Sequence, residues 1–282
     1  MPANKLFILL FTLLFFPSFR PTSHPPTTHR LEIVFEPENH RFSSLERQIA
    51  RNIIINASQK VRSLLSTLPK KIKVSLSVTN ENLEEIGGVN GVALSNAPAE
   101  VAIVVSRKYP GGIQAAMQKS LSVIIFHEFH HLSRGWVYHD NAFEASILNA
   151  SINEGLAIIF AEKYTGVKLA RFDCPKEVNQ WSKEIQSLSK QANFDHWMFE
   201  HPDGRSAIGY KVGKYLVQEA MKYSGENIVE ISKHTPKEIL QMASPIPLMG
   251  FRSPYPRSLP ANHDKSLPFV ENSTKLRYTP HP

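Results

Sequence analysis

The pattern of hydrophobic and polar positions differs between the two halves of the chain. In the first half, residues 31–35 (LEIVF) group apolar side chains as a short strand does, and residues 71–79 (KIKVSLSVT) alternate like a half-buried strand. Residues 87–95 are rich in glycine, with strand character in their second half, and residues 100–105 are rich in β-branched side chains. These patterns predict a small sheet, either mixed or mostly antiparallel.

Long helices are predicted around and after these strands. Ser43 and Glu46 have the spacing of a capping box, and apolar residues then recur at helical spacing until Leu68 and Pro69 end the pattern. From Gly112 onward the pattern is almost wholly helical, to about residue 243. The sequence therefore predicts an α+β fold, with a small sheet beside one long helix and a mostly helical C-terminal half.

The two ends of the chain differ in composition from this region. Lys5 precedes an apolar run that is too short to span a bilayer comfortably and is typical of an export signal. We assign residues 1–20 to a signal peptide or, alternatively, an uncleaved N-terminal membrane anchor, and residues 21–30 to a linker. Residues 31–243 are the predicted folded domain, and residues 244–282 a proline-rich irregular tail. We therefore expect an exported protein that is periplasmic, secreted or anchored to the membrane.

Composition and charge narrow the classes of function. A chain of 282 residues that is 42% hydrophobic and 20% charged is typical of a soluble globular protein. The net charge is +7, but the chain has no run of alternating lysines and aromatics, so we expect a solvated basic surface and no nucleic-acid partner. Cys174 is the only cysteine, which excludes an intrachain disulfide and a zinc site made of cysteines.

The main chemical signal is the segment IIFHEFHHLSRG, residues 124–135, within a helix predicted over residues 113–134. His127 and His131 are four residues apart on one helical face, so both imidazoles can bind one metal ion. Glu128 is adjacent, where its carboxylate can reach a water in an open coordination position. This HExxH pattern predicts a zinc site in which the two histidines are ligands and the glutamate is the general base.

A catalytic zinc needs a third protein ligand, and Glu154 is the candidate. It occurs in NEGLA, near the start of an amphipathic helix predicted over residues 151–166. Gly155 and Ala157 are small and would let this helix approach the HEFHH helix closely at the metal. The alternative for Glu154 is a helix-start carboxylate that the helix dipole favours.

Other polar residues near these motifs have plainer explanations. His130 points away from the histidine pair, so we expect it to be a core residue. Glu162 is expected on a solvated face or in an ion pair, and Glu144 is a weaker competitor for the third ligand position.

Three segments together carry a family resemblance: HEFHH, NEGLAIIFAE and GYKVGKYLV. They resemble the bacterial family of predicted zinc-dependent proteases, whose domain was long catalogued as of unknown function. The resemblance covers roughly residues 71–243 and implies the wider group of gluzincins, with a zincin fold that has a small sheet beside the active-site helix. It implies one zinc ion held by His127, His131 and Glu154, with Glu128 as the base.

The chain departs from the thermolysin-like pattern at one position. In that pattern a carboxylate one turn after the glutamate ligand supports a ligating histidine, but here Ile158 occupies that turn. The support must come from elsewhere, and Asp140, Asn153 and the backbone are the alternatives.

Two further features bear on substrate binding. Tyr210 is the candidate donor to the developing oxyanion, since it starts an apolar helix in the third motif, although an aromatic residue packed in the core has the same signature. His201 and Arg205 are lower-ranked donors. Residues 87–95 either supply an edge strand that pairs with an extended peptide or mark a plain turn.

The expected activity is hydrolysis of a peptide bond in a peptide or protein substrate. A zinc-activated water would attack the carbonyl, while Glu128 takes its proton and returns it to the leaving amine. The alternative is an exported zinc-binding or interaction protein without proteolytic turnover, although such a protein has no need of Glu128 as a base. A purely helical structural domain would require HEFHH and NEGLA to coincide by chance.

Overall fold

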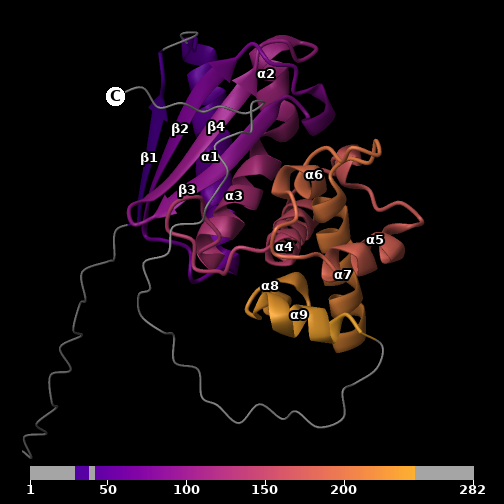
Figure 1. Cartoon of the computed structure of the whole chain (residues 1–282). Coiled ribbons are helices and arrows are strands. Elements are labelled where there is room, and N and C mark those ends of the chain that lie inside the picture. The colour runs from indigo at the N-terminus through magenta and orange to yellow at the C-terminus, as the bar shows by residue number, and fades with distance from the viewer. Residues whose placement is uncertain (1–28, 38–41, 245–282) are drawn as a thin grey trace, which may run out of the picture.

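The computed structural model describes residues 29–37 and 42–244 (Figure 1). The predicted signal or anchor, nearly all of the linker and nearly all of the proline-rich tail lie outside the described residues. Within those ranges, no helix is both long enough and apolar enough to cross a membrane.

In the described part of the chain, four strands form one mixed sheet in the order β1-β2-β4-β3. β1 (Arg30–Phe35), β2 (Lys71–Thr79) and β4 (Ala99–Ser106) are parallel, and β3 (Val89–Asn96) pairs antiparallel with β4 at one edge. Each strand coincides with an apolar pattern in the sequence, and the mixed arrangement is the correct one of the two predicted. The predicted α+β class with a small sheet is confirmed.

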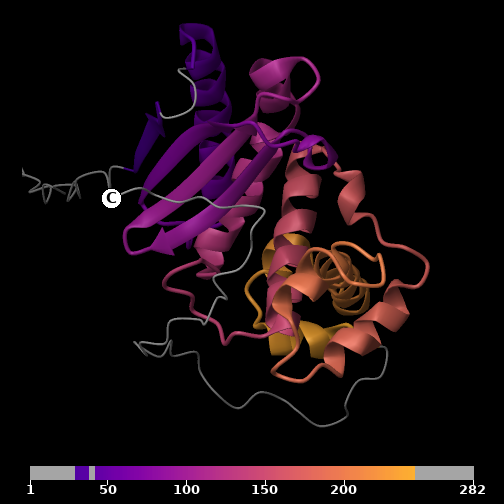
Figure 2. The same ribbon diagram turned by 45° about the horizontal axis from the view of Figure 1, so that its top comes forward.

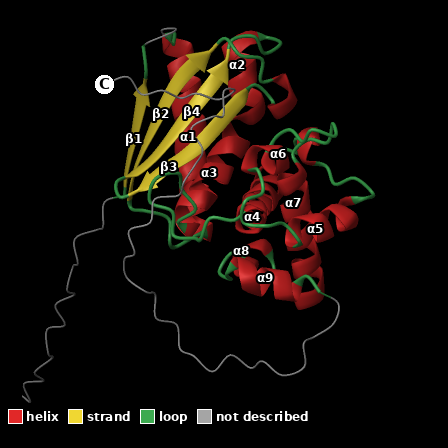
Figure 3. Ribbon diagram, in the orientation of Figure 1, coloured by secondary structure: helices red, strands yellow, loops and turns green. Residues whose placement is uncertain are grey.

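Helices cover one face of this sheet, with α1 (Ser44–Leu64) and α3 (Ser122–Arg134) lying side by side (Figures 2 and 3). Buried and partly exposed residues alternate along β2, as they do when one face of a sheet is packed against other elements. The predicted capping box begins α1: Ser43 Oγ accepts from the Glu46 N–H at 3.2 Å, and Glu46 Oε2 accepts from the Ser43 N–H at 2.7 Å.

The helix predicted over residues 113–134 is interrupted. The structure has three consecutive helical segments, α2 (Gly112–Ala116), the π-helical η2 (Met117–Leu121) and α3. A π-helical turn holds more residues than an α-helical turn, so it changes which residues of α3 face the sheet. α3 ends as predicted at Gly135, whose φ of 75° is the left-handed conformation typical of a glycine after a helix.

The C-terminal half is helical and surrounds α4 (Ile147–Thr165). Its other elements are α5 (Val178–Gln186), α6 (Phe194–Met198), α7 (Ile208–Ser224), α8 (Ile228–Ile231), α9 (Pro236–Met242) and the 3-10 turn η3 (Ala170–Phe172), whereas the 3-10 turn η1 (Glu84–Ile86) lies between β2 and β3. α4 is buried on most sides, because α3, α7 and the shorter helices pack around it (Figure 1). Its predicted amphipathic character is therefore wrong.

Two glycines set the contact between α4 and α7. A Cβ atom on Gly155 would lie 2.1 Å from the carbonyl carbon of Gly213, and a Cβ on Gly213 would lie 1.6 Å from the carbonyl oxygen of Ser151. Neither position can hold a larger side chain without moving the backbones apart. The sequence placed Gly155 at the contact with the HEFHH helix, whereas the structure shows that it serves the contact with α7.

Candidate metal centre

Helix α3 brings two imidazoles together on one face. His127 and His131 lie one turn apart, and their Nε2 atoms are 2.9 Å from each other. Their rings are nearly perpendicular, with an interplanar angle of 89° and centroids 4.5 Å apart. Because both nitrogens point to the same place, the spacing produces the shared site that the sequence predicts.

Helix α4 adds a carboxylate to this pair. Glu154 Oε2 lies 3.0 Å from His127 Nε2 and 3.3 Å from His131 Nε2. Glu154 is about two turns inside α4, which begins at Ile147, so the helix-start explanation for this carboxylate does not fit the structure. Among the described residues, these three form the one group of histidine, cysteine or acidic side chains with the geometry to hold a metal ion.

The three atoms suit a zinc ion by their chemistry and their spacing. Ligands about 2.0–2.1 Å from a tetrahedral zinc ion lie roughly 3.3 Å from one another, close to the distances observed here. Two imidazole nitrogens and a carboxylate oxygen cannot all satisfy one another with protons in so small a space. A divalent cation satisfies all three lone pairs at once, and two histidines with one glutamate are a known catalytic zinc set.

The charges of this group shift one another's pKa values. Burial alone would raise the pKa of Glu154, but the adjacent His131 and His127 hold it well below its usual value. Burial would lower the pKa of His127, but the hydrogen bond to Glu154 and the charges of Glu128 and Glu154 raise it. Glu154 is therefore held as a carboxylate, the state in which it can bind a cation.

Glu128 lies between the histidines and the edge of the sheet. Only 5% of its surface is exposed, and this burial raises the pKa of its carboxyl group, although His127 and His131 oppose the shift. The backbone of Ala93 in β3 donates a hydrogen bond to the carboxylate. A Cβ atom on Gly91 would lie 2.8 Å from Glu128 Cγ, so a glycine is needed where β3 passes over this side chain.

The edge of β3 is open over only part of its length. The Ser106 N–H donates a hydrogen bond to the Gly88 carbonyl at 2.8 Å, so the backbone of Gly88 faces β4. Hydrogen-bonded and non-hydrogen-bonded pairs alternate along two antiparallel strands, and Gly91 and Ala93 therefore direct their backbone groups away from β4. The Ala93 carbonyl, however, already accepts a hydrogen bond from the Tyr138 N–H at 2.9 Å. The predicted edge strand therefore exists, but the loop after α3 covers it from Ala93 onward.

Neither side chain predicted to support a ligating histidine does so. Asp140 accepts from the Asn96 N–H at 2.9 and 3.1 Å, and Asn153 Oδ1 accepts from Arg134 Nε at 2.9 Å. In the described part of the chain, the buried His131 Nδ1 has no hydrogen-bond partner.

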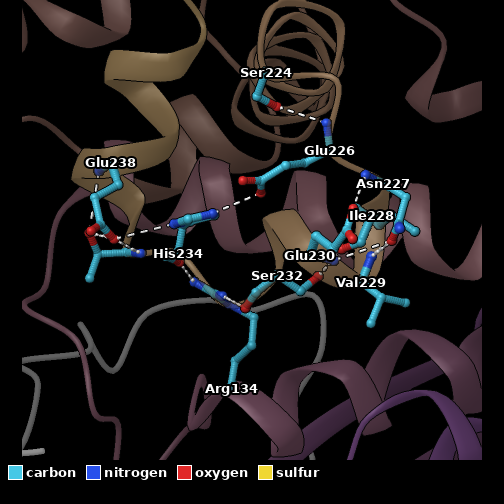
Figure 4. Close-up of polar contacts among 11 residues, drawn as sticks. Arg134, Ser224, Glu226, Asn227, Ile228, Val229, Glu230, Ser232, His234 and Glu238 are labelled. Atoms are coloured by element: carbon cyan, nitrogen blue, oxygen red, sulfur yellow. Dashed lines mark hydrogen bonds and ion pairs between the residues drawn. The ribbon is translucent and has the colours of Figure 1, made fainter. Parts of the chain in front are cut away.

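Arg134, at the end of α3, connects the metal helices to the C-terminal helices (Figure 4). Besides Asn153, it donates to the carbonyl oxygens of Ser232 and His234, the second at 3.1 Å. Burial lowers the pKa of its guanidinium to about 10, so it remains charged at neutral pH. This contact holds α3, α4 and the α8 to α9 turn together beside Glu154.

Sequence reasoning missed one residue that contacts a candidate metal ligand. Trp136 Nε1 donates to Glu154 Oε1 at 3.2 Å, on the carboxylate oxygen that does not face the histidines. The signal that could have found it is its position directly after Gly135, where a turn at the end of α3 sends the chain back toward α4.

The other acidic and histidine candidates lie outside the centre. Glu144 has a side chain that is 76% exposed and pairs with Lys190, so it cannot be the third ligand in this arrangement. Glu162 forms the predicted ion pair, with Lys214 Nζ 2.7 Å from its carboxylate. His130 is fully buried, as expected of a core residue, and its Nε2 lies 2.8 Å from Ser232 Oγ.

Tyr210 lies in the first turn of α7 and packs against Phe172, with ring centroids 5.1 Å apart. Burial, and then the nearby charges of Glu154 and Glu128, raise the pKa of its phenol well above the usual value. Its hydroxyl makes no hydrogen bond to any other described residue. The structure thus places Tyr210 near the centre and in an aromatic contact at the same time.

His201 and Arg205 belong to a separate group of charges. His201 Nδ1 lies 2.8 Å from Asp203 Oδ1, and Arg205 pairs with both Asp203 and Glu184 at 2.8 and 2.7 Å. The Arg205 guanidinium also lies over the rings of two tryptophans, which fixes its position away from the metal centre.

Comparisons with known proteins agree with this geometry. A sequence model of one protein family matches residues 55–241, more than half of the chain, and its description reads "Predicted Zn-dependent protease (DUF2268)". No match was found among curated proteins or among solved structures.

Proposed function

Since the chain belongs to this family of predicted Zn-dependent proteases, we propose that it is a zinc metallopeptidase that hydrolyses peptide bonds. One observation carries the proposal. His127 Nε2, His131 Nε2 and Glu154 Oε2 lie within 2.9 to 3.3 Å of one another, and the buried carboxyl of Glu128 is beside them. A site for structural zinc would have four protein ligands and no need of an adjacent base.

In this proposal, one zinc ion per chain is held by His127, His131 and Glu154. When bound, the ion would supply Lewis acidity, which lowers the pKa of a water and polarises the carbonyl to be attacked. The protein's part is to hold the three ligands in fixed positions and leave the remaining side open.

Glu128 moves the proton. As the oxygen of a water forms a bond to the carbonyl carbon of the substrate, the Glu128 carboxylate takes a proton from that water. The carboxyl group then gives the proton to the amide nitrogen, the C–N bond breaks, and an amine and a carboxylic acid leave. Burial favours this cycle, because it raises the pKa of Glu128 toward neutral pH, where the group can both accept and return a proton.

Tyr210 is the proposed donor to the oxyanion that develops on the carbonyl oxygen. Its raised pKa keeps the phenol protonated at neutral pH, as a hydrogen-bond donor must be. The charges of Glu154 and Glu128 contribute to this rise in the pKa of Tyr210, which supports a position of its phenol near the reacting atoms.

For the substrate, we propose pairing of an extended peptide with the open part of the β3 edge at Gly91. The backbone of Gly91 faces away from β4, and the residue is partly exposed next to Glu128. We further propose that residues 31–243 act as one catalytic domain that is exported, either released or held at a membrane by the N-terminal segment.

Zinc content and cleavage of a protein substrate test the proposal together. Three proteins are purified with zinc: the unmodified protein, here called the full chain, the variant Glu128→Gln and the control variant Glu144→Gln. Each is then incubated with an unfolded protein as substrate. We expect about one zinc per chain in all three, with cleavage only by the full chain and the control, because Glu144 is exposed and outside the centre.

The other outcomes are equally informative. Absence of zinc from all three proteins would overturn the metal site itself. Zinc in all three without cleavage of any substrate offered would favour an exported zinc-binding protein without turnover. Cleavage by Glu128→Gln at the full rate would overturn the role of Glu128 as the base.

A further inference from the structure

We propose that Trp136 is a positioning residue for the third metal ligand, holding one oxygen of Glu154 so that the other oxygen faces the histidines. This inference rests on the proposed zinc site. It concerns a contact between the turn that ends α3 and the middle of α4, two elements that each supply ligands.

The backbone of the turn fixes where Trp136 begins. The Gly135 N–H bonds to the Leu132 carbonyl at 3.3 Å, and the Trp136 N–H bonds to the His131 carbonyl at 3.0 Å. Together with the φ of 75° at Gly135, these two bonds form a Schellman motif, in which the residue after the glycine is tied to the helix. The same residue is therefore bonded through its backbone to one ligand, His131.

The side chain of Trp136 then reaches the other helix. Its indole N–H donates to Glu154 Oε1 at 3.2 Å, whereas Glu154 Oε2 is the atom near the two imidazoles. The indole ring is held by Phe143, with ring centroids 6.1 Å apart. Phe143 in turn lies under the Arg134 guanidinium, 5.4 Å from its ring centroid.

This arrangement assigns a separate task to each carboxylate oxygen. Indole is a donor only, so it can bind Oε1 without competing for the cation or accepting a proton from the site. With Oε1 held, rotation of the carboxylate about its last torsion is restricted, and Oε2 stays directed at the histidines. Such indirect partners of a metal typically change affinity or activity by about 10–100-fold when they are removed.

The test is zinc affinity, measured in competition with a chelator, for the full chain and two tryptophan variants. Trp136→Phe keeps an aromatic ring but removes the N–H donor. Trp181→Phe is the matched control, because Trp181 lies in α5 and stacks with Arg205 and Lys211. We expect Trp136→Phe to bind zinc about tenfold more weakly or worse, and Trp181→Phe to bind it as the full chain does.

Tryptophan fluorescence gives a second readout that does not depend on activity. Zinc binding changes the charge next to the indole of Trp136, so we expect zinc to alter the emission of the full chain and of Trp181→Phe. The same addition should leave the emission of Trp136→Phe almost unchanged. Because this variant also lacks the reporting indole, the signal tests whether Trp136 lies beside the bound zinc, and the zinc affinity of folded variants tests its positioning role.

Thermal unfolding of the metal-free proteins shows whether Trp136→Phe is folded. If it is not, 3-benzothienylalanine at position 136 removes only the N–H, because sulfur replaces it in a ring of the same shape, and the same loss of zinc affinity is expected. Equal zinc affinity in folded Trp136 variants and the full chain would overturn this inference and leave the proposed function intact. Failure of every protein to bind zinc would overturn the proposed function as well.

Discussion

Two groups of ionisable side chains in this protein both combine histidine with carboxylates, but they differ in their balance of hydrogen-bond donors and acceptors. The metal-centre group consists of His127, Glu128, His131 and Glu154, and the loop group consists of Glu184, His201, Asp203 and Arg205. In the loop group, each carboxylate faces a donor at 2.7 to 2.8 Å, and Arg205 has two carboxylate partners. In the metal-centre group, three atoms with lone pairs converge on one another.

The difference lies in the balance of donors and acceptors, which composition alone does not reveal. Arg205 supplies several fixed N–H donors, so the loop group is complete without a ligand. No arginine or lysine contacts the converging atoms of the metal-centre group in the described residues, and the partner that we propose for them is a cation from solution. A histidine close to carboxylates indicates a metal site only when its neighbours leave lone pairs facing a common point.

The largest expected effect comes from removing one histidine from each group. His131→Ala removes a direct ligand, so we expect zinc affinity to fall by more than the roughly 10–100-fold typical of an indirect partner. His201→Ala removes one partner of Asp203 and should leave zinc affinity unchanged. Zinc titration of the two variants and the full chain checks this, and weakened binding by His201→Ala would show that the groups are not independent.

A glycine beside each group offers the next comparison. In Gly91→Ala, the new Cβ would lie 2.7 Å from Ile124 Cγ2 and 2.8 Å from Glu128 Cγ, so the base must move. Since a displacement of about 1 Å can cost roughly 100-fold in rate, we expect a loss of that order in peptide hydrolysis with zinc retained. In Gly204→Ala, the φ of 90° is strained but nothing lies within 4 Å of the new atom.

Hydrolysis and bound zinc are measured for both glycine variants. For Gly204→Ala we expect both to match the full chain, with a stability loss of about 1–2 kcal/mol from the left-handed conformation. If Gly91→Ala hydrolysed peptide at the full rate, Glu128 could not be the residue whose position limits the reaction.

These contrasts also show how far the sequence could predict the site. His127 and His131 could be predicted from the sequence, because helical periodicity places residues four apart on one face, whatever surrounds the helix. The strands could be predicted for a similar local reason, since the alternation of apolar and polar residues is visible within one segment. Glu154 was found through a motif, and the structure supplies the reason, because α4 crosses α3 at that residue.

What the sequence could not predict depends on contacts between distant segments. Arg134 and Ser232 are 98 residues apart, and neither carries a local signal that they meet. The partner of Gly155 was misassigned because a glycine indicates a close approach without indicating which helix approaches. Asn153 is one of the alternatives that the sequence leaves open for the support of a histidine, but in the structure its side-chain oxygen accepts a hydrogen bond from Arg134.

Arg134, which bonds to the neighbour of Glu154 in the chain, and Arg205 of the loop group give a third, smaller comparison, measured as stability. Arg134→Met leaves the side-chain oxygen of Asn153 and two carbonyl oxygens without a buried donor, which should destabilise the fold by about 3 kcal/mol. Arg205→Met frees carboxylates that water can reach, so we expect a loss of about 1 kcal/mol or less. Chemical denaturation of the metal-free proteins measures both, and equal losses would contradict the difference in burial.

The smallest expected effect is a pH dependence confined to the loop group. Burial would raise the pKa of Asp203, but the backbone N–H of Arg205 and the side chains of His201 and Arg205 together lower it to about 2, from 3.8. A carboxyl group whose pKa is lower in the folded state stabilises the fold above its unfolded pKa. That contribution should therefore be complete above about pH 4 and disappear as the pH falls toward 2.

Asp203→Asn removes this titration without touching the metal-centre group. Unfolding midpoints of the metal-free full chain and of Asp203→Asn, measured between about pH 2 and pH 5, should differ most at the upper end and converge at the lower end. The exposure of Asp203 keeps the difference small, since water and salt screen its partners. A constant difference across the range would mean that Asp203 acts through the turn it caps, because its carboxylate also accepts the Arg205 N–H, and that the loop group is held by geometry more than by charge.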